Sequence, residues 1–140
     1  MTLSLPYRIE DPQANRDLEM IALNLVNQER VTAGLEPLMP HATIRTAARA
    51  HGIEMFTFGY LSHRSRDGRW PTERVKDLRV RVTIVGENLA YAQDVREAHR
   101  VLIESAPHRE NMLSPRYRRF GIGVIDGGQY GVIVVQNFSD

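Results

Sequence analysis

Hydrophobic residues recur at helical spacing in three stretches of the chain. In residues 17–33 the apolar positions follow the i, i+3, i+4, i+7, i+8 pattern of one helix face, namely Leu18, Ile21, Ala22, Leu25 and Val26. Residues 42–58 carry a second such face, rich in alanine, and residues 95–105 carry a third. The pattern predicts three long helices with one buried side each, and a short helix from Pro71 to about Leu78.

Patterns typical of strands are concentrated in the second half of the chain. Residues 80–91 predict a short strand that runs into a turn at Gly86. Residues 118–126 and 129–138 are rich in β-branched residues and are joined by an Asp-Gly-Gly run, which is a strong hairpin signal. Both faces of residues 129–138 are apolar, so we expect this strand to be covered on both sides.

The order of these elements is two helices, a strand, a helix and a hairpin. It predicts an α+β fold, arranged as a three-layer α/β/α sandwich with a mainly antiparallel central sheet. Residues 1–16, which include Pro6 and Pro12, predict an irregular N-terminal arm before a single domain of residues 17–140. A chain of 140 residues can bury roughly two thirds of its unfolded surface, which is enough for a substantial core.

Composition excludes several classes of protein. The chain has no cysteine, which rules out disulfides, a thiol nucleophile and cysteine-based zinc sites. Its net charge of +1 gives no strong field for binding a nucleic acid. The sequence shows neither a signal peptide nor a transmembrane stretch of about 20 apolar residues. It is compatible with a cytosolic protein or with a chain trimmed at its N-terminus.

Three polar residues stand near predicted element boundaries, where side chains can converge on one cleft. His63 follows the second helix, Glu87 follows the predicted turn, and His108 lies at the end of the third long helix. Two imidazoles and a carboxylate suit a divalent metal, zinc above all, and they suit proton transfer equally well. Spacing alone leaves open a third interpretation, in which the three are unrelated surface or capping residues.

Five segments that follow one another along the chain resemble motifs of the CAP superfamily. This family includes cysteine-rich secretory proteins, antigen 5 allergens, pathogenesis-related proteins and bacterial SCP-like domains. The segments are LNLVNQERVTAGLEPL, AARAHG, LSHRSRDG, VGENLAY and HRENMLSPRYRRFGIGV. The resemblance is to the short bacterial form, and it covers the chain from about Asp17 to Phe138.

The resemblance implies an α/β/α sandwich whose central cleft is lined by two histidines and acidic residues. His63 matches the family's "SH", Glu87 its "GEN" and His108 its "GHR", so these three are the candidate catalytic residues and metal ligands. The sequence also departs from the family pattern. The usual tryptophan, the glycine before the second histidine and a second acidic residue are replaced by Leu102, Pro107 and Ser105.

Other polar residues have a structural interpretation beside a functional one. Asn111 and Gln136 are candidates for lining the cleft, although Asn111 is also expected to bond its own backbone in a turn. Ser62 is not expected to act as a nucleophile, since adjacent residues rarely make the required hydrogen bond. We expect structural or solvated roles for the remaining candidates: His41 as an N-cap, His51 partly buried, His99 solvated, Trp70 in the core, and Arg116, Arg118 and Arg119 on a solvated face.

Three functions remain open at this stage. The favoured one is a binding module for a divalent metal and/or a small or lipidic ligand, and the resemblance implies that it acts outside the cell or at the envelope. The alternative is a hydrolase, for example a peptidase, in which a metal or Glu87 with a histidine activates water. The third is an interaction domain whose polar cluster is only an internal network. The sequence does not indicate the oligomeric state.

Overall fold

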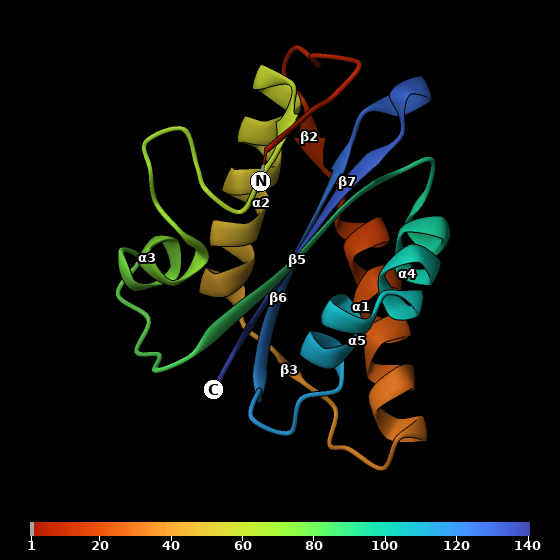
Figure 1. Ribbon diagram of the computed structural model, residues 1–140, viewed down its shortest axis with the longest axis vertical. Helices are drawn as coiled ribbons and strands as arrows, with labels where there is room; N and C mark the ends of the chain where they lie inside the picture. Colours follow the sequence, from red (N-terminus) through yellow and green to blue (C-terminus); the bar gives the residue numbers. More distant parts are fainter. Residues whose placement is uncertain (1) are drawn as a thin grey trace.

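A central sheet separates two layers of helices in the computed structural model, which describes residues 2–140 (Figure 1). The strands of the sheet lie in the order β2 (Gln13–Ala14), β6 (Arg119–Asp126), β7 (Val132–Ser139) and β5 (Val85–Ala92). These neighbours are antiparallel, and β3 (Met39–Pro40) pairs parallel with β6. The predicted α/β/α sandwich with a mainly antiparallel sheet is therefore confirmed, and β5 forms one edge of the sheet.

The helices divide between the two faces of the sheet (Figure 1). One layer holds α1 (Arg16–Thr32), α4 (Val95–Glu104) and α5 (Ala106–Met112), and the other holds α2 (Ala42–Phe58) and α3 (Pro71–Lys76). A short 3₁₀ turn, Gly128–Tyr130, connects β6 to β7. The predicted N-terminal arm carries β2 and also β1 (Leu3–Ser4), which pairs with β4 (Tyr60–Leu61) after α2.

Strand β7 is buried along its whole length, as its two apolar faces predict. Val132, Val134 and Phe138 pack into the cluster shared with α1, α4 and α5. Ile133 and Val135 pack into the cluster on the α2 side. Alternate residues of one strand therefore join two cores, which fixes the register of the sheet between the helical layers.

Helix α2 packs directly against β6. A Cβ atom on Gly123 would lie 2.8 Å from the backbone nitrogen of Arg49, and one on Gly121 would overlap the backbone of Ile44 and Arg45. Ala47 and Ala48 on the facing side of the helix are buried. The alanine-rich face predicted from the sequence thus meets two glycines, and the two backbones approach more closely than larger side chains allow.

The turn predicted at Gly86 is wrong. Strand β5 runs without interruption from Val85 to Ala92, so Glu87 lies within the strand and not after a turn. A Cβ atom on Gly86 would overlap the ring and hydroxyl of Tyr117. The glycine is explained by this close approach, which its small size permits, and not by a reversal of the chain.

The sequence predicts that His108 lies at the end of the third long helix, and this prediction is wrong. Helix α4 ends at Glu104, and Ser105 has an extended backbone with φ −93° and ψ 120°. A separate helix, α5, then begins at Ala106, so that Pro107 stands in its first turn and His108 follows it. Proline has no N–H to donate and its φ suits a helix start, so it is accepted there although it would break a continuing helix.

Two further expectations about single residues are wrong. Trp70 is half exposed and lies outside the core. His99 is buried on α4, where its Nε2 lies 3.3 Å from Glu29 Oε1 of α1. His41 does cap α2, as expected, because the backbone N–H of Ile44 donates to its Nδ1 at 3.2 Å. None of the helices between residues 2 and 140 is long and apolar enough to cross a bilayer.

Candidate functional site

Glu87 is the most heavily bonded side chain of the candidate site. Its carboxylate is 1% exposed and accepts hydrogen bonds from three residues. Arg74 of α3 donates from Nη1 to Oε2 at 3.0 Å and from Nη2 to Oε1 at 3.2 Å. Asn137, which faces Glu87 in the register of β5 and β7, donates to Oε2 at 2.8 Å, and His63 Nδ1 lies 2.8 Å from Oε1.

These partners set the charge of Glu87. Burial raises the pKa of its carboxyl, but the hydrogen bond from His63 and the charge and hydrogen bonds of Arg74 outweigh it, so the pKa is lowered overall. Glu87 is therefore an ionised carboxylate in the folded protein. An ionised carboxylate only accepts hydrogen bonds, so Nδ1 of His63 carries the proton of that contact.

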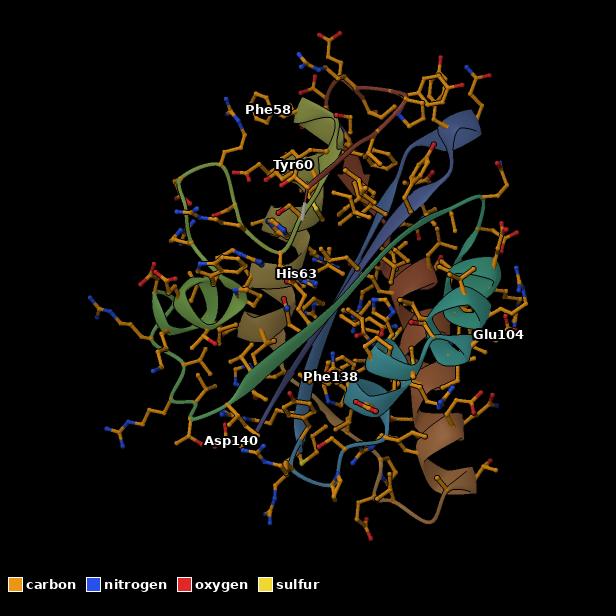
Figure 2. The ribbon with its side chains drawn as sticks, viewed as in Figure 1. Phe58, Tyr60, His63, Glu104, Phe138 and Asp140 are labelled. Carbon is orange, nitrogen blue, oxygen red and sulfur yellow. The ribbon has the colours of Figure 1, made fainter. Side chains whose placement is uncertain are left out.

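His63 combines a fixed ring with an accessible edge. Its side chain is 45% exposed although Nδ1 is bonded to Glu87. The backbone carbonyl of His63 accepts a hydrogen bond from Arg74, and the preceding carbonyl, of Ser62, lies 2.7 Å from Nε2 of the buried His51. The loop is thus held on both sides of His63, and in its neutral form the ring offers Nε2 as a free acceptor (Figure 2 shows His63 beside the sheet).

His108 lies in the other helical layer, on α5. Its Nδ1 lies 2.8 Å from Oγ of Ser105, the residue that separates α4 from α5. Burial lowers the pKa of His108, and the charge of His63 lowers it further. Both histidines contact neighbouring residues of the edge strand β5: His63 is bonded to Glu87, and the backbone carbonyl of His108 accepts from Asn88.

A second polar network connects His108 to the sheet. The Asn88 amide donates to the backbone carbonyl of His108 at 3.0 Å and to Oε1 of Gln136 at 3.1 Å. Asn111 of α5 donates to Oδ1 of Asn88 at 2.9 Å. Asn111 therefore bonds across to β5 and not to its own backbone, and the fully buried Gln136 supports the network from β7.

The donor set fits a divalent metal only in part. Nowhere in residues 2–140 do three or more His, Asp or Glu side chains form a group that could hold a metal ion. Both oxygens of Glu87 are bonded to the Arg74 guanidinium, whose positive charge opposes a cation at that place. The Nε2 atoms of His63 and His108 remain as possible metal ligands, and Glu87 is suited to orienting His63.

Four residues of this arrangement were missed by sequence reasoning. Asn137 left a signal, since it is a polar residue in an apolar strand next to Gln136, and Asn88 belongs to the same short motif as Glu87. Ser105 was noted only as a lost acidic position. The sequence gives no indication of the role of Arg74. A charged residue on a short helix is expected at the surface, and only the fold shows that this helix packs against β5.

The remaining candidates lie outside these contacts or support them. Ser62 is buried, and its hydroxyl accepts a hydrogen bond from the backbone N–H of Arg64 at 3.1 Å. Arg119 donates to the backbone carbonyl of Asp140 at 2.7 Å and to that of Arg81 at 2.6 Å. These bonds join the end of β6 to the segment before β5.

Comparisons with known proteins identify the class of this α/β/α domain as CAP. Residues 23–138 match the CAP family model, described as the cysteine-rich secretory protein family. An uncharacterized protein of Bacillus subtilis, YkwD, is 30% identical over 118 residues, which are 84% of this chain and 46% of YkwD. The chain belongs to the CAP family, and the resemblance found in its motifs is confirmed.

Solved structures share the fold. An extracellular protein containing an SCP domain from Bacillus anthracis is 25% identical with a TM-score of 0.79, over 88% of this chain and 40% of that protein. An outer surface protein from Borrelia burgdorferi is 16% identical with a TM-score of 0.85, over 92% of this chain and 98% of its own. The chain thus spans less than half the length of YkwD and of the Bacillus anthracis protein.

Proposed function

We propose that this CAP domain is a ligand-binding module in which His63 and His108 contact the ligand through their Nε2 atoms. The observation that carries the proposal is that both Nδ1 atoms are bonded within the protein, to Glu87 and to Ser105. Each ring is thereby oriented with its second nitrogen available. Such preorganisation lowers the cost of ordering side chains when a ligand binds.

The bonding of Glu87 favours binding over hydrolysis. A general base needs a free lone pair aimed at a water and a pKa near the working pH. Glu87 instead has a lowered pKa, and its oxygens accept from Arg74, Asn137 and His63. We therefore assign Glu87 the role of positioning His63, and we do not favour a peptidase in which Glu87 activates water.

A divalent metal such as Zn²⁺ is one ligand that these two imidazoles can take. His63 and His108 would hold it, and water or a further ligand would complete its coordination. When bound, the ion would supply a positive centre for an anionic or carbonyl-bearing molecule. A small polar molecule that hydrogen-bonds both rings is the metal-free version of the same proposal. The extracellular relative from Bacillus anthracis supports a place of action outside the cell or at its envelope.

The test is calorimetric titration of Zn²⁺ into metal-free protein near pH 7. We expect one-to-one binding that is abolished in His63→Ala and His108→Ala. Glu87→Gln should weaken it by roughly 10- to 100-fold, because it removes the carboxylate that orients a ligand. His41→Asn is the matched control, since it removes a histidine elsewhere while keeping an N-cap residue.

Two results would count against the proposal. Wild-type binding that survives in both His→Ala variants would place the metal elsewhere. If the wild type hydrolyses peptides and Glu87→Gln does not, the protein is a hydrolase that uses Glu87 and not a binding module. A folded wild type that binds no Zn²⁺ would remove the metal version and leave the polar-ligand version for small-molecule screening.

A further inference from the structure

A second surface groups arginines with exposed aromatic side chains, and we call it the basic aromatic face. It surrounds a groove of about 550 Å³ between the N-terminal arm, the end of α2 with β4, and the loop of residues 62–66. Phe58 and Tyr60, on this side of the molecule, are labelled above His63 in Figure 2. The face is defined by Arg8, Phe58, Arg64, Arg66 and Trp70.

The three arginines of this face carry charge that the fold leaves uncompensated. Within residues 2–140 none of them forms an ion pair with a carboxylate. Glu54 lies nearby and accepts from the backbone N–H of Arg66 and from Tyr60. The end of α2 adds about half a negative charge. Three guanidinium groups exceed both together, so the groove keeps a net positive charge.

Two of these guanidinium groups lie over aromatic rings. The Arg66 guanidinium carbon is 3.6 Å from the centre of the Phe58 ring, and that of Arg64 is 5.9 Å from the centre of the Trp70 ring. The Arg8 side chain covers Gly59, where a Cβ atom would come within 2.8 Å of its Cγ. Arg64 also donates from Nε to the backbone carbonyl of Gly68 at 3.2 Å, and stacking leaves the remaining N–H groups free to donate.

The two aromatic side chains of this face remain exposed to solvent beside the arginines. Trp70 is 50% exposed and Phe58 39%. Exposed aromatic side chains next to arginines are the combination found where proteins meet the headgroup layer of a bilayer. A soluble anion would need the arginines alone and gives no reason for the exposed apolar groups beside them.

We propose that the basic aromatic face binds the surface of an anionic phospholipid membrane, with a headgroup phosphate in the groove. Arg8, Arg64 and Arg66 donate to the phosphate oxygens, as guanidinium groups do. Phe58 and Trp70 enter the headgroup layer. The binding is peripheral and uses neither the His63 nor the His108 ring, so it does not depend on the function proposed above.

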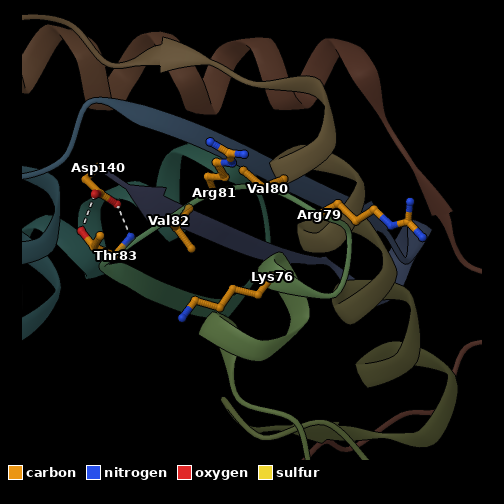
Figure 3. Close-up of a pocket in the computed structure, with 7 residues that line it drawn as sticks. All are labelled: Lys76, Arg79, Val80, Arg81, Val82, Thr83 and Asp140. Carbon is orange, nitrogen blue, oxygen red and sulfur yellow. Dashed lines mark hydrogen bonds between the residues drawn. The ribbon is translucent and has the colours of Figure 1, made fainter.

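The chain offers a matched comparison for this site. Lys76, Arg79 and Arg81 line another groove, of about 430 Å³, next to Asp140, which accepts hydrogen bonds from Thr83. Figure 3 shows that the three basic side chains point in different directions. Replacing them removes the same three charges without touching the basic aromatic face.

The experiment uses vesicles of phosphatidylcholine alone or mixed with phosphatidylglycerol. Trp70 is the only tryptophan of the chain, so its fluorescence reports on this face directly. We expect a blue shift and co-sedimentation with the anionic vesicles only, both weakened by added salt. The variant Arg8→Gln/Arg64→Gln/Arg66→Gln should bind at least tenfold more weakly, since each arginine near an anionic surface contributes about fivefold. The variant Lys76→Gln/Arg79→Gln/Arg81→Gln should bind like the wild type.

Three outcomes would overturn the proposal. The first is a folded wild type that does not bind the anionic vesicles. The second is an equal loss of binding in the two triple variants, which would indicate a response to net charge alone. The third is saturation by soluble glycerol phosphate, without vesicles, that shifts the Trp70 emission and blocks vesicle binding. That result would assign the groove to a free phosphate ester.

Discussion

Arg74 and Glu87 form a buried ion pair between α3 and the edge strand β5. Arg74 Nη1 and Glu87 Oε2 are 3.0 Å apart, and the two side chains are 5% and 1% exposed. The same guanidinium also donates to the backbone carbonyl of His63. One arginine therefore neutralises the carboxylate and holds the loop that carries the accessible histidine.

Removing Arg74 should be strongly destabilising. Arg74→Met leaves Glu87 buried without its cationic partner, and we expect the free energy of unfolding to fall by about 3–5 kcal/mol. Arg69→Met is the control, because Arg69 pairs with Asp67 and Asp77 at the surface and should cost less than about 1 kcal/mol. Urea unfolding of both variants measures the difference. Equal losses would show that the pair at Glu87 is no more important than a surface one.

Stability should fall in acid through Glu87. Its pKa in the folded protein is lowered from the ordinary value of 4.5, so its stabilising contribution is complete above that pH and is lost as the pH falls through the lower, folded-state value. We expect the gap in melting temperature between wild type and Glu87→Gln to be largest near pH 7 and to narrow below pH 4.5. Thermal melts across this range test it. A gap independent of pH would contradict an ionised Glu87.

The titration of His108 should depend on His63. Burial and then the charge of His63 lower the pKa of His108 below 6.5, so neutral His108 stabilises the fold at high pH and this contribution is lost as the pH falls. In His63→Gln we expect the NMR-measured pKa of His108 to rise while remaining below 6.5, because burial persists. His41 provides an internal control, since its lowered pKa arises from burial and Arg119. An unchanged His108 titration would mean that the two rings do not share a cleft.

The contact of α2 with β6 should tolerate no added atom at Gly121. A Cβ atom there overlaps backbone that cannot move without shifting the helix, so we expect Gly121→Ala to lower the free energy of unfolding by about 3 kcal/mol. In Gly34→Ala the added Cβ atom has no neighbour within 4 Å. The free energy of unfolding should therefore fall only by the cost of the φ of +79°, about 1 kcal/mol. Denaturant titration of the two variants gives the comparison. A smaller loss for Gly121→Ala than for Gly34→Ala would refute the close packing.

The layers of the fold could be predicted because they depend on local periodicity. The faces of residues 17–33 and 42–58 and the doubly apolar strand at residues 129–138 specify which sides are buried. Gly86 was assigned to a turn because local rules do not show that it makes room for Tyr117. The separate helix that begins beside Pro107 was missed because the helical pattern of residues 95–105 does not reveal where the backbone bends.

The sequence singled out His63, Glu87, His108, Asn111 and Gln136 but none of the residues that bond to Glu87 from other elements, apart from His63. The partners of Glu87 are distant in sequence. Asn137 faces it from the neighbouring strand β7, and Arg74 reaches it from helix α3. Periodicity carries no information about such contacts. The division of the chain into an arm and a domain at residue 17 stays a prediction.

The position of β5 at the edge of the sheet has a consequence for the ligand binding that we propose. His63 reaches the edge from the layer of α2 and α3, and His108 reaches it from the layer of α4 and α5. A molecule held by both rings bridges the two halves of the sandwich and must be released before they separate. The affinity of the domain for such a molecule would therefore depend on the distance between the two helical layers. A core substitution far from either histidine would alter binding by changing that distance.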